Sequence, residues 1–124
     1  MIAADTSVLI DYFQGENNTQ TDQLNDVLTH HLLVLPPAVL VEILSDPFLP
    51  KEFVDKIEEL PLLELTENYW QRAGINRSSL IAKKLKARLA DTLIAQSCID
   101  HQVPLITRDT DFKHFVKYCG LALF

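Results

Sequence analysis

Three acidic residues occur in this sequence within apolar segments, where a charge is not expected. Asp5 ends a short apolar run, and Glu42 and Asp91 are each the only charged residue in a longer apolar stretch. An unpaired carboxylate that is removed from water either costs several kcal/mol or takes up a proton, so it needs a compensating partner. We therefore expect a chemical or structural role for each of these acids.

Two further acids, Asp109 and Asp111, follow a fourth apolar run at residues 104–107. Oxygen ligands without His or Cys at metal-binding spacing favour a hard cation, so Mg²⁺ or Mn²⁺ fits better than zinc. One or two such ions could position a water, stabilise its deprotonated form and neutralise the charge that builds on a phosphodiester during in-line displacement. If Asp5 and Asp109 serve one site, the strands before them must be neighbours, because adjacent strands lie only about 4.8 Å apart.

Other chemistries have weaker support. Each acid taken alone fits ordinary helix capping or a salt bridge equally well, and only the set as a whole favours a site. Paired carboxylates could also hydrolyse a glycoside, but a domain this small offers no obvious aromatic platform for a sugar, and Trp70 and the Tyr residues are not near the acids in the sequence. The four His residues lack metal-binding spacing, and no Ser has a neighbouring His that would make it a nucleophile.

Strands and helices must alternate to position these acids. Apolar runs bounded by turn residues predict strands at 1–4, 32–35, 62–65, 104–107 and 121–124. Helical spacing predicts helices at 8–13, 19–31, 38–44, 51–60, 67–85, 90–101 and 112–118, the first capped by Thr6 or Ser7. This alternation is typical of an α/β fold with a mostly parallel sheet and helices on both faces.

Length and composition predict one domain over residues 1–124 with a sizeable core, since 48% of the residues are hydrophobic. No apolar run approaches the ~20 residues of a membrane span, and an acid at position 5 argues against a signal peptide. We therefore expect a cytoplasmic protein without a membrane segment. Two Cys residues agree with that expectation, and Cys98 lies in an apolar helical run typical of a core position.

The net charge of −6 is unevenly distributed. Residues 1–60 carry 11 acidic and two basic residues, whereas residues 61–124 carry six acidic and nine basic residues. Several of the bases, Lys83, Lys84, Lys86 and Arg88, cluster just before Asp91. Such a local cationic ridge can hold a phosphate backbone, although spacing alone slightly favours a solvated helix face.

Together these residues resemble the PIN-domain ribonucleases, and in particular the small VapC-like toxins of type II toxin–antitoxin pairs. The resemblance lies in four stretches, at residues 5–11, 41–44, 90–95 and 107–112. They occur in the family order and cover the chain from end to end, and the length also matches. One departure is that residues 37–41 lack the Ser or Thr often found before the second acid.

The resemblance implies a PIN-like three-layer α/β/α fold with a five-stranded sheet in the order 3-2-1-4-5. It also implies that the catalytic and metal-binding acids are Asp5, Glu42, Asp91 and Asp109, with Asp111 as an additional or alternative ligand of Mg²⁺ or Mn²⁺. The hydroxyls that would orient the carboxylates or the water are those of Thr6, Ser7 and Thr107.

The implied function is a metal-dependent ribonuclease that cleaves RNA with a metal-activated water, with a small antitoxin as partner and with a possible homodimer. Residues expected to contact phosphates are Lys83, Lys84, Lys86, Arg88 and Arg108. Apolar helix positions such as Leu24, Val27, Phe48 and Phe53 could serve a partner surface, though core packing is the better expectation. Alternatives are a PIN-like module that binds RNA or protein without cutting, and a phosphatase or other metal hydrolase on a similar sheet.

Overall fold

Three short parallel strands lie at the centre of the computed structural model, which describes residues 1–124. Strand β1 (Ile2–Ala4) lies between β2 (Leu33–Val34) and β3 (Leu105–Ile106), in the order β2-β1-β3. Ala3 and Ala4 have no exposed surface, as expected for a central parallel strand that is covered on both faces. The predicted adjacency of the strands that precede Asp5 and Asp109 is thus confirmed.

The expected strands at 62–65 and 121–124 are reduced to single parallel bridges, which pair Leu62 with Leu35 and Leu123 with Leu105. These bridges follow the predicted spatial order 3-2-1-4-5, but a regular five-stranded sheet is not formed. The ladder between Leu35 and Leu62 ends after one bridge because Pro36 and Pro37, which follow Leu35, have no N–H to donate. The ladder between Leu105 and Leu123 is not extended toward Val103, because the Val103 N–H donates to the carbonyl of Cys98 at 2.9 Å.

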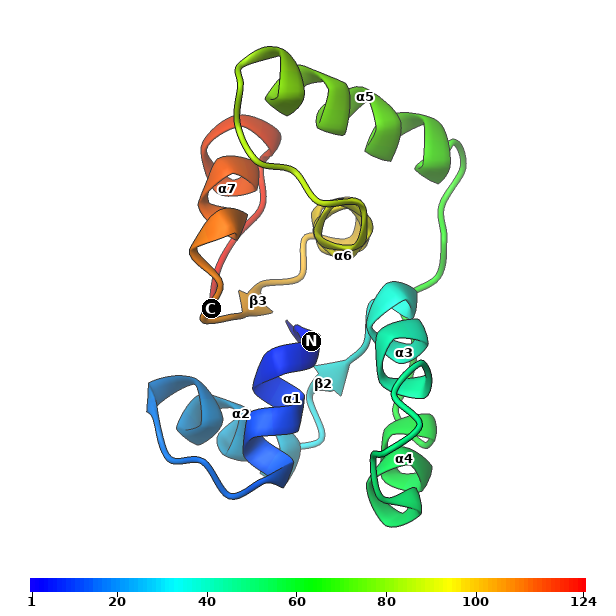
Figure 1. Cartoon of the computed structure of the whole chain (residues 1–124), viewed down its shortest axis with the longest axis vertical. Coiled ribbons are helices and arrows are strands. Elements are labelled where there is room, and N and C mark those ends of the chain that lie inside the picture. Colours follow the sequence, from blue (N-terminus) through cyan, green and yellow to red (C-terminus); the bar gives the residue numbers. More distant parts are fainter.

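Helices cover both faces of the sheet and complete a three-layer α/β/α arrangement. Figure 1 shows α5, α6 and α7 on one side, α1 and α2 on the other, and α3 and α4 beside the β2 edge. The helix bounds are α1 Thr6–Phe13, α2 Thr19–Thr29, α3 Pro37–Leu44, α4 Lys51–Glu58, α5 Tyr69–Ala82, α6 Leu89–His101 and α7 Lys113–Cys119, with a short 3-10 helix η1 at Thr110–Phe112. None of these helices combines the length and the apolar character needed to cross a bilayer.

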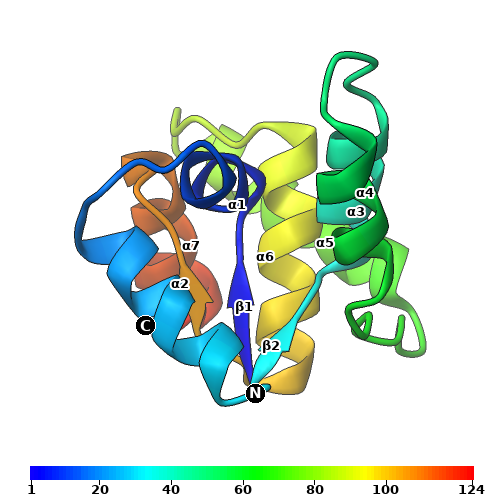
Figure 2. The same ribbon diagram turned by 90° about the horizontal axis from the view of Figure 1, so that it is seen from below.

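The first helix begins two residues earlier than expected, and its cap is an acid. The Asp5 carboxylate, at the carboxyl end of β1, accepts a hydrogen bond from the Val8 N–H at 3.0 Å. The expected caps Thr6 and Ser7 are instead the first two residues of α1, and their hydroxyls contact other groups. Figure 2 shows β1 leading directly into α1 at one end of the sheet.

A single cluster of 25 buried residues forms the hydrophobic core. Leu24, Val27 and Phe53 belong to it, and so does Cys98, as predicted. Phe48 does not, because 92% of its surface is exposed, so the expectation of core packing is wrong for this residue. It lies in the turn between α3 and α4, where its N–H donates to the Asp46 carboxylate at 2.9 Å and prolines flank the turn, so the local backbone fixes Phe48 outside the core.

Candidate active and metal site

The predicted acids meet in a cavity at the carboxyl ends of β1 and β3. This cavity has a volume of about 270 Å³ and is mostly polar; its lining residues are Asp5, Thr6, Ser7, Ile10, Glu42, Arg88, Asp91, Ile94 and Asp109. Strand β1 leads to Asp5, helix α3 carries Glu42, helix α6 carries Asp91, and the turn after β3 carries Asp109. Folding thus gathers four acids from four distant segments, while Asp111 lies beside Asp109 just outside the lining.

Asp5 is almost fully buried, with 4% of its surface exposed. Its Oδ1 accepts from the Val8 N–H at 3.0 Å and from the Ser7 hydroxyl at 3.3 Å, and its Oδ2 accepts from the Thr107 hydroxyl. Burial raises the pKa of this carboxyl above its ordinary value, the hydrogen bonds lower it, and the charge of Asp109 raises it further. The net direction is upward, so Asp5 holds its negative charge at a cost that a nearby cation would offset.

The three hydroxyls expected to orient the acids all contact them. Besides the Ser7 and Thr107 contacts with Asp5, the Thr6 hydroxyl donates to Glu42 Oε1 at 2.7 Å. The Thr107 hydroxyl also accepts from the Asp109 N–H at 3.0 Å, which links both strand ends. Thr6, on α1, therefore supplies Glu42 with a hydroxyl that residues 37–41 of α3 lack.

Asp91 is the acid with an unsatisfied oxygen. It lies in the first turn of α6, and its Oδ2 is buried without a hydrogen-bond partner. The pKa of this carboxyl is raised to about 6, mainly by burial and then by the charges of Asp109, Glu42 and Asp111, while the Arg88 guanidinium opposes the rise. A buried polar atom without a donor is rare and needs an explanation, which a cation ligand would supply.

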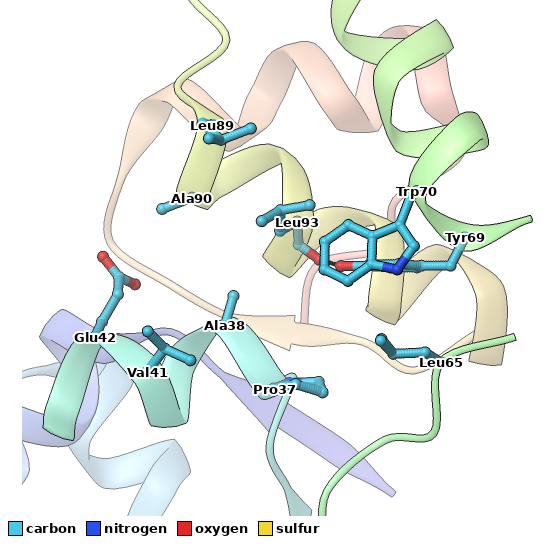
Figure 3. A pocket seen from close by; sticks show the side chains of 10 residues that line it. All are labelled: Pro37, Ala38, Val41, Glu42, Leu65, Tyr69, Trp70, Leu89, Ala90 and Leu93. Atoms are coloured by element: carbon cyan, nitrogen blue, oxygen red, sulfur yellow. Dashed lines mark hydrogen bonds between the residues drawn. The ribbon is translucent and has the colours of Figure 1, made fainter. Parts of the chain in front are cut away.

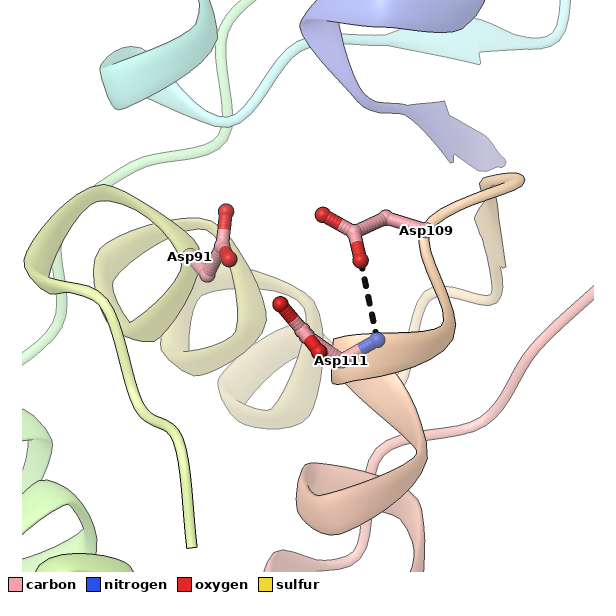
Figure 4. Close-up of side chains that lie close together, drawn as sticks. All are labelled: Asp91, Asp109 and Asp111. Carbon is pink, nitrogen blue, oxygen red and sulfur yellow. Dashed lines mark hydrogen bonds between the residues drawn. The ribbon is translucent and has the colours of Figure 1, made fainter.

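Asp91, Asp109 and Asp111 offer ligand oxygens that all lie within 4.8 Å of one another. In Figure 4, Asp91 on α6 faces the other two acids, and the Asp111 N–H donates to Asp109 Oδ1 at 2.9 Å. An all-oxygen donor set of this kind suits Mg²⁺ or Mn²⁺. Together with the unpartnered oxygen of Asp91, the donor set makes these residues chemically suited to a divalent cation.

The basic residues singled out in the sequence have different surroundings. Lys86 Nζ lies 3.2 Å from Asp111 Oδ2, and Arg88 lines the acidic cavity. Arg108 Nη1 lies 3.6 Å from Asp11 Oδ2, and Lys83 lies over the Tyr118 ring at 5.3 Å from its centroid. Lys84 is exposed and lies in a left-handed backbone conformation. Of these five basic residues, only Lys86 and Arg88 lie beside the acids of the candidate site.

An apolar groove of about 250 Å³ lies next to the acidic cavity and was not predicted (Figure 3). It is formed mainly by α3, α5 and α6, and its lining residues are Pro37, Ala38, Val41, Glu42, Leu65, Tyr69, Trp70, Leu89, Ala90 and Leu93. Glu42 lines both hollows, so the groove opens beside the acids. Trp70 lines the groove together with Glu42, although the two residues are far apart in the sequence. The Trp70 side chain is largely exposed, with 62% of its surface accessible.

Several solved structures have the same fold over nearly the whole chain. VapBC2 from Rickettsia felis, bound to a DNA fragment of its promoter, aligns with a TM-score of 0.75 and 20% identity, covering 100% of this chain and 98% of that one. FitAcB from Neisseria gonorrhoeae aligns with a TM-score of 0.72 and 20% identity, covering 100% and 96%. VapBC-5 from Mycobacterium tuberculosis, a member of the VapBC family of toxin–antitoxin systems, aligns with a TM-score of 0.70 and 16% identity, covering 99% and 96%.

At these identities the likeness concerns the fold. No curated protein sequence matches the chain. A family model does match, and it covers residues 2–118, which include all the acids that line the cavity. The chain therefore belongs to the PIN domain family.

Proposed function

We propose that this PIN-domain protein is a Mg²⁺- or Mn²⁺-dependent endoribonuclease that acts in the cytoplasm. The observation that carries the proposal is the convergence of four carboxylates in one cavity, among them Asp91 with its buried and unpartnered oxygen. The four carboxylates of this cavity outnumber the basic side chains beside them, which are Arg88 in the lining and Lys86 at the rim. Membership of the PIN domain family adds support for nuclease chemistry.

The residues that would hold the cation are Asp5, Glu42, Asp91 and Asp109, with Asp111 at the edge of the set. When bound, a divalent cation would supply Lewis acidity and neutralise charge on a phosphodiester. The chain's own residues prepare this site: Thr107 and Ser7 fix the Asp5 carboxylate, and Thr6 fixes that of Glu42. Arg88, in the cavity wall, would bind a substrate phosphate, and Lys83, Lys84, Lys86 and Arg108 would extend the cationic surface for RNA.

We further infer that the protein is the toxin of a toxin–antitoxin pair and that its partner is a small antitoxin. Support comes from the similar fold of VapBC-5, a member of the VapBC family of toxin–antitoxin systems. The site offers a partner two contrasting surfaces, an apolar groove and an acidic cavity that share Glu42. An antitoxin segment with an apolar helix followed by a basic side chain would complement both surfaces. A homodimer of this chain is a further expectation, to be tested by light scattering.

The test is cleavage of RNA by purified wild-type protein, Asp5→Asn and Asp91→Asn, in Mg²⁺, in Mn²⁺ and in EDTA. Asp26→Asn is the matched control, because Asp26 is an exposed acid on α2 that does not line the cavity. The proposal predicts cation-dependent cleavage by the wild type and the control, and none by the two site variants, all with unchanged circular dichroism.

Full activity in either site variant would refute the assignment of the site. RNA binding without cleavage and without stoichiometric Mn²⁺ uptake would instead indicate a PIN-like binding module. Hydrolysis of a small chromogenic phosphoester without RNA cleavage would indicate a phosphatase. Co-purification with the product of the neighbouring gene tests the antitoxin separately.

A further inference from the structure

A lysine of this chain already neutralises part of the acidic cluster. Lys86 lies in the connection between α5 and α6, and its Nζ lies 3.2 Å from Asp111 Oδ2. Asp111 is one of the three acids whose ligand oxygens lie within 4.8 Å of one another. The side chains of Lys86 and Asp111 are 52% and 25% exposed, so this ion pair lies at the rim of the cavity and not deep within it.

The backbone of Asp111 is held beside the neighbouring acid Asp109. Its N–H donates to Asp109 Oδ1 at 2.9 Å, which ties the η1 turn to the neighbouring acid. A divalent cation binds carboxylate oxygens at about 2.1–2.6 Å, so a cation on Asp111 would lie close to the Lys86 ammonium. Two positive groups at such a distance repel each other, so each weakens the binding of the other to Asp111.

Neighbouring cations do not share this position. Arg88 lines the cavity but forms no ion pair with an acid, and Lys113, two residues after Asp111, is exposed and forms none either. Lys86 is thus the one basic residue that is paired with the acids of this cluster.

We propose that Lys86 is an internal counter-ion that competes with a divalent cation for Asp111 and thereby sets the cation affinity of the site. This inference rests on the proposed metal site and adds a residue that regulates it. While no cation is bound, the ammonium relieves repulsion among the acids. When a cation takes Asp111, Lys86 is released at the rim of the cavity, where a substrate phosphate would arrive.

The experiment is calorimetric titration with MnCl₂ of metal-free wild type, Lys86→Gln and the control Lys113→Gln. Since an exposed ion pair contributes up to about 1 kcal/mol, Lys86→Gln should bind Mn²⁺ roughly two- to fivefold more tightly at low ionic strength. Lys113→Gln removes the same charge near the same turn and should leave the affinity near the wild-type value. The gain should shrink at high salt, which screens an exposed pair.

A double-mutant cycle assigns the effect to Asp111. In an Asp111→Asn background, Lys86→Gln should change the Mn²⁺ affinity no further, and persistence of the full gain would overturn the inference. So would equal or weaker binding by Lys86→Gln in the wild-type background, or an equal gain in Lys113→Gln. Absence of Mn²⁺ binding in every protein would overturn the proposed metal site as well, whereas wild-type binding that is insensitive to Lys86 overturns the counter-ion alone.

Discussion

Asp91→Asn should stabilise the metal-free protein while it removes the response to metal. The wild-type carboxyl has a pKa raised to about 6, first by burial and then by Asp109. A carboxyl whose pKa is higher in the folded than in the unfolded chain favours folding while it is protonated. That contribution is fully present below the unfolded pKa, near 4, and is lost as the pH rises through 6. At neutral pH the ionised Asp91 therefore destabilises the fold, and a neutral amide does not.

The size of the effect follows from the same pKa. At ~1.4 kcal/mol per pKa unit, a rise from 3.8 to about 6 corresponds to roughly 3 kcal/mol at most. Asp91 is half-buried, and solvent screening reduces this to about 1–1.5 kcal/mol. In a domain of this length that equals a rise in Tm of about 4–6 °C at pH 7.5. Titration of the wild-type carboxyl should shrink the difference to roughly a third at pH 4.5.

The assay is thermal unfolding followed by circular dichroism, in EDTA and in MnCl₂, with Asp26→Asn as the control. Free Mn²⁺ at 100 times its Kd should stabilise wild type and control by about 2.7 kcal/mol, and Asp91→Asn by much less. The reasoning is refuted if Asp91→Asn has a lower Tm than wild type in EDTA at pH 7.5. It is equally refuted if Mn²⁺ stabilises Asp91→Asn as much as wild type.

Three further outcomes are expected. Thr107→Val removes the hydroxyl that bonds Asp5 and Asp109, and should weaken Mn²⁺ binding about 10- to 100-fold in calorimetry; unchanged affinity would contradict the orienting role. Neutralising Lys84, Lys86 and Arg88 together should weaken RNA binding and flatten its dependence on salt, measured by fluorescence anisotropy, and an unaltered salt slope would count against these phosphate contacts. Arg72→Ala leaves the Asp100 side chain, 6% exposed, without its guanidinium partner and should cost about 1–3 kcal/mol in urea unfolding, whereas a loss below about 0.5 kcal/mol would mean that the pair contributes little.

The positions of the acids could be predicted because apolar segments made each charge conspicuous. A short apolar run that ends in Asp5 predicts a buried strand with an acid at its carboxyl end, and β1 has this form. The same logic placed Asp109 after a strand, and the family resemblance implied that this strand is the neighbour of the first, as β3 is of β1. Alternating strand and helix signals predicted the parallel arrangement, because such connections bring the carboxyl ends of the strands to one edge.

Contacts between distant segments were not predictable from local patterns. The sequence favours Thr6 or Ser7 as a cap, but the fold uses the Asp5 carboxylate, because burial leaves its oxygens near the Val8 N–H. The pairing of Lys86 with Asp111 depends on how the α5–α6 connection packs beside η1, which no spacing along the chain reveals. The strands expected at 62–65 and 121–124 are shorter than predicted, because an apolar run does not reveal whether backbone N–H groups are available to pair with a neighbouring strand.

Four carboxylates from separate segments line one cavity, and we propose that a divalent cation relieves the repulsion among them. Crystals grown with MnCl₂ and measured at a wavelength where manganese scatters anomalously test this claim most directly. We expect an anomalous peak within about 2.5 Å of carboxylate oxygens of Asp91 and Asp109, and no such peak in Asp91→Asn crystals. Wild-type crystals in which the cavity holds no manganese, or in which manganese binds only elsewhere on the surface, would contradict it.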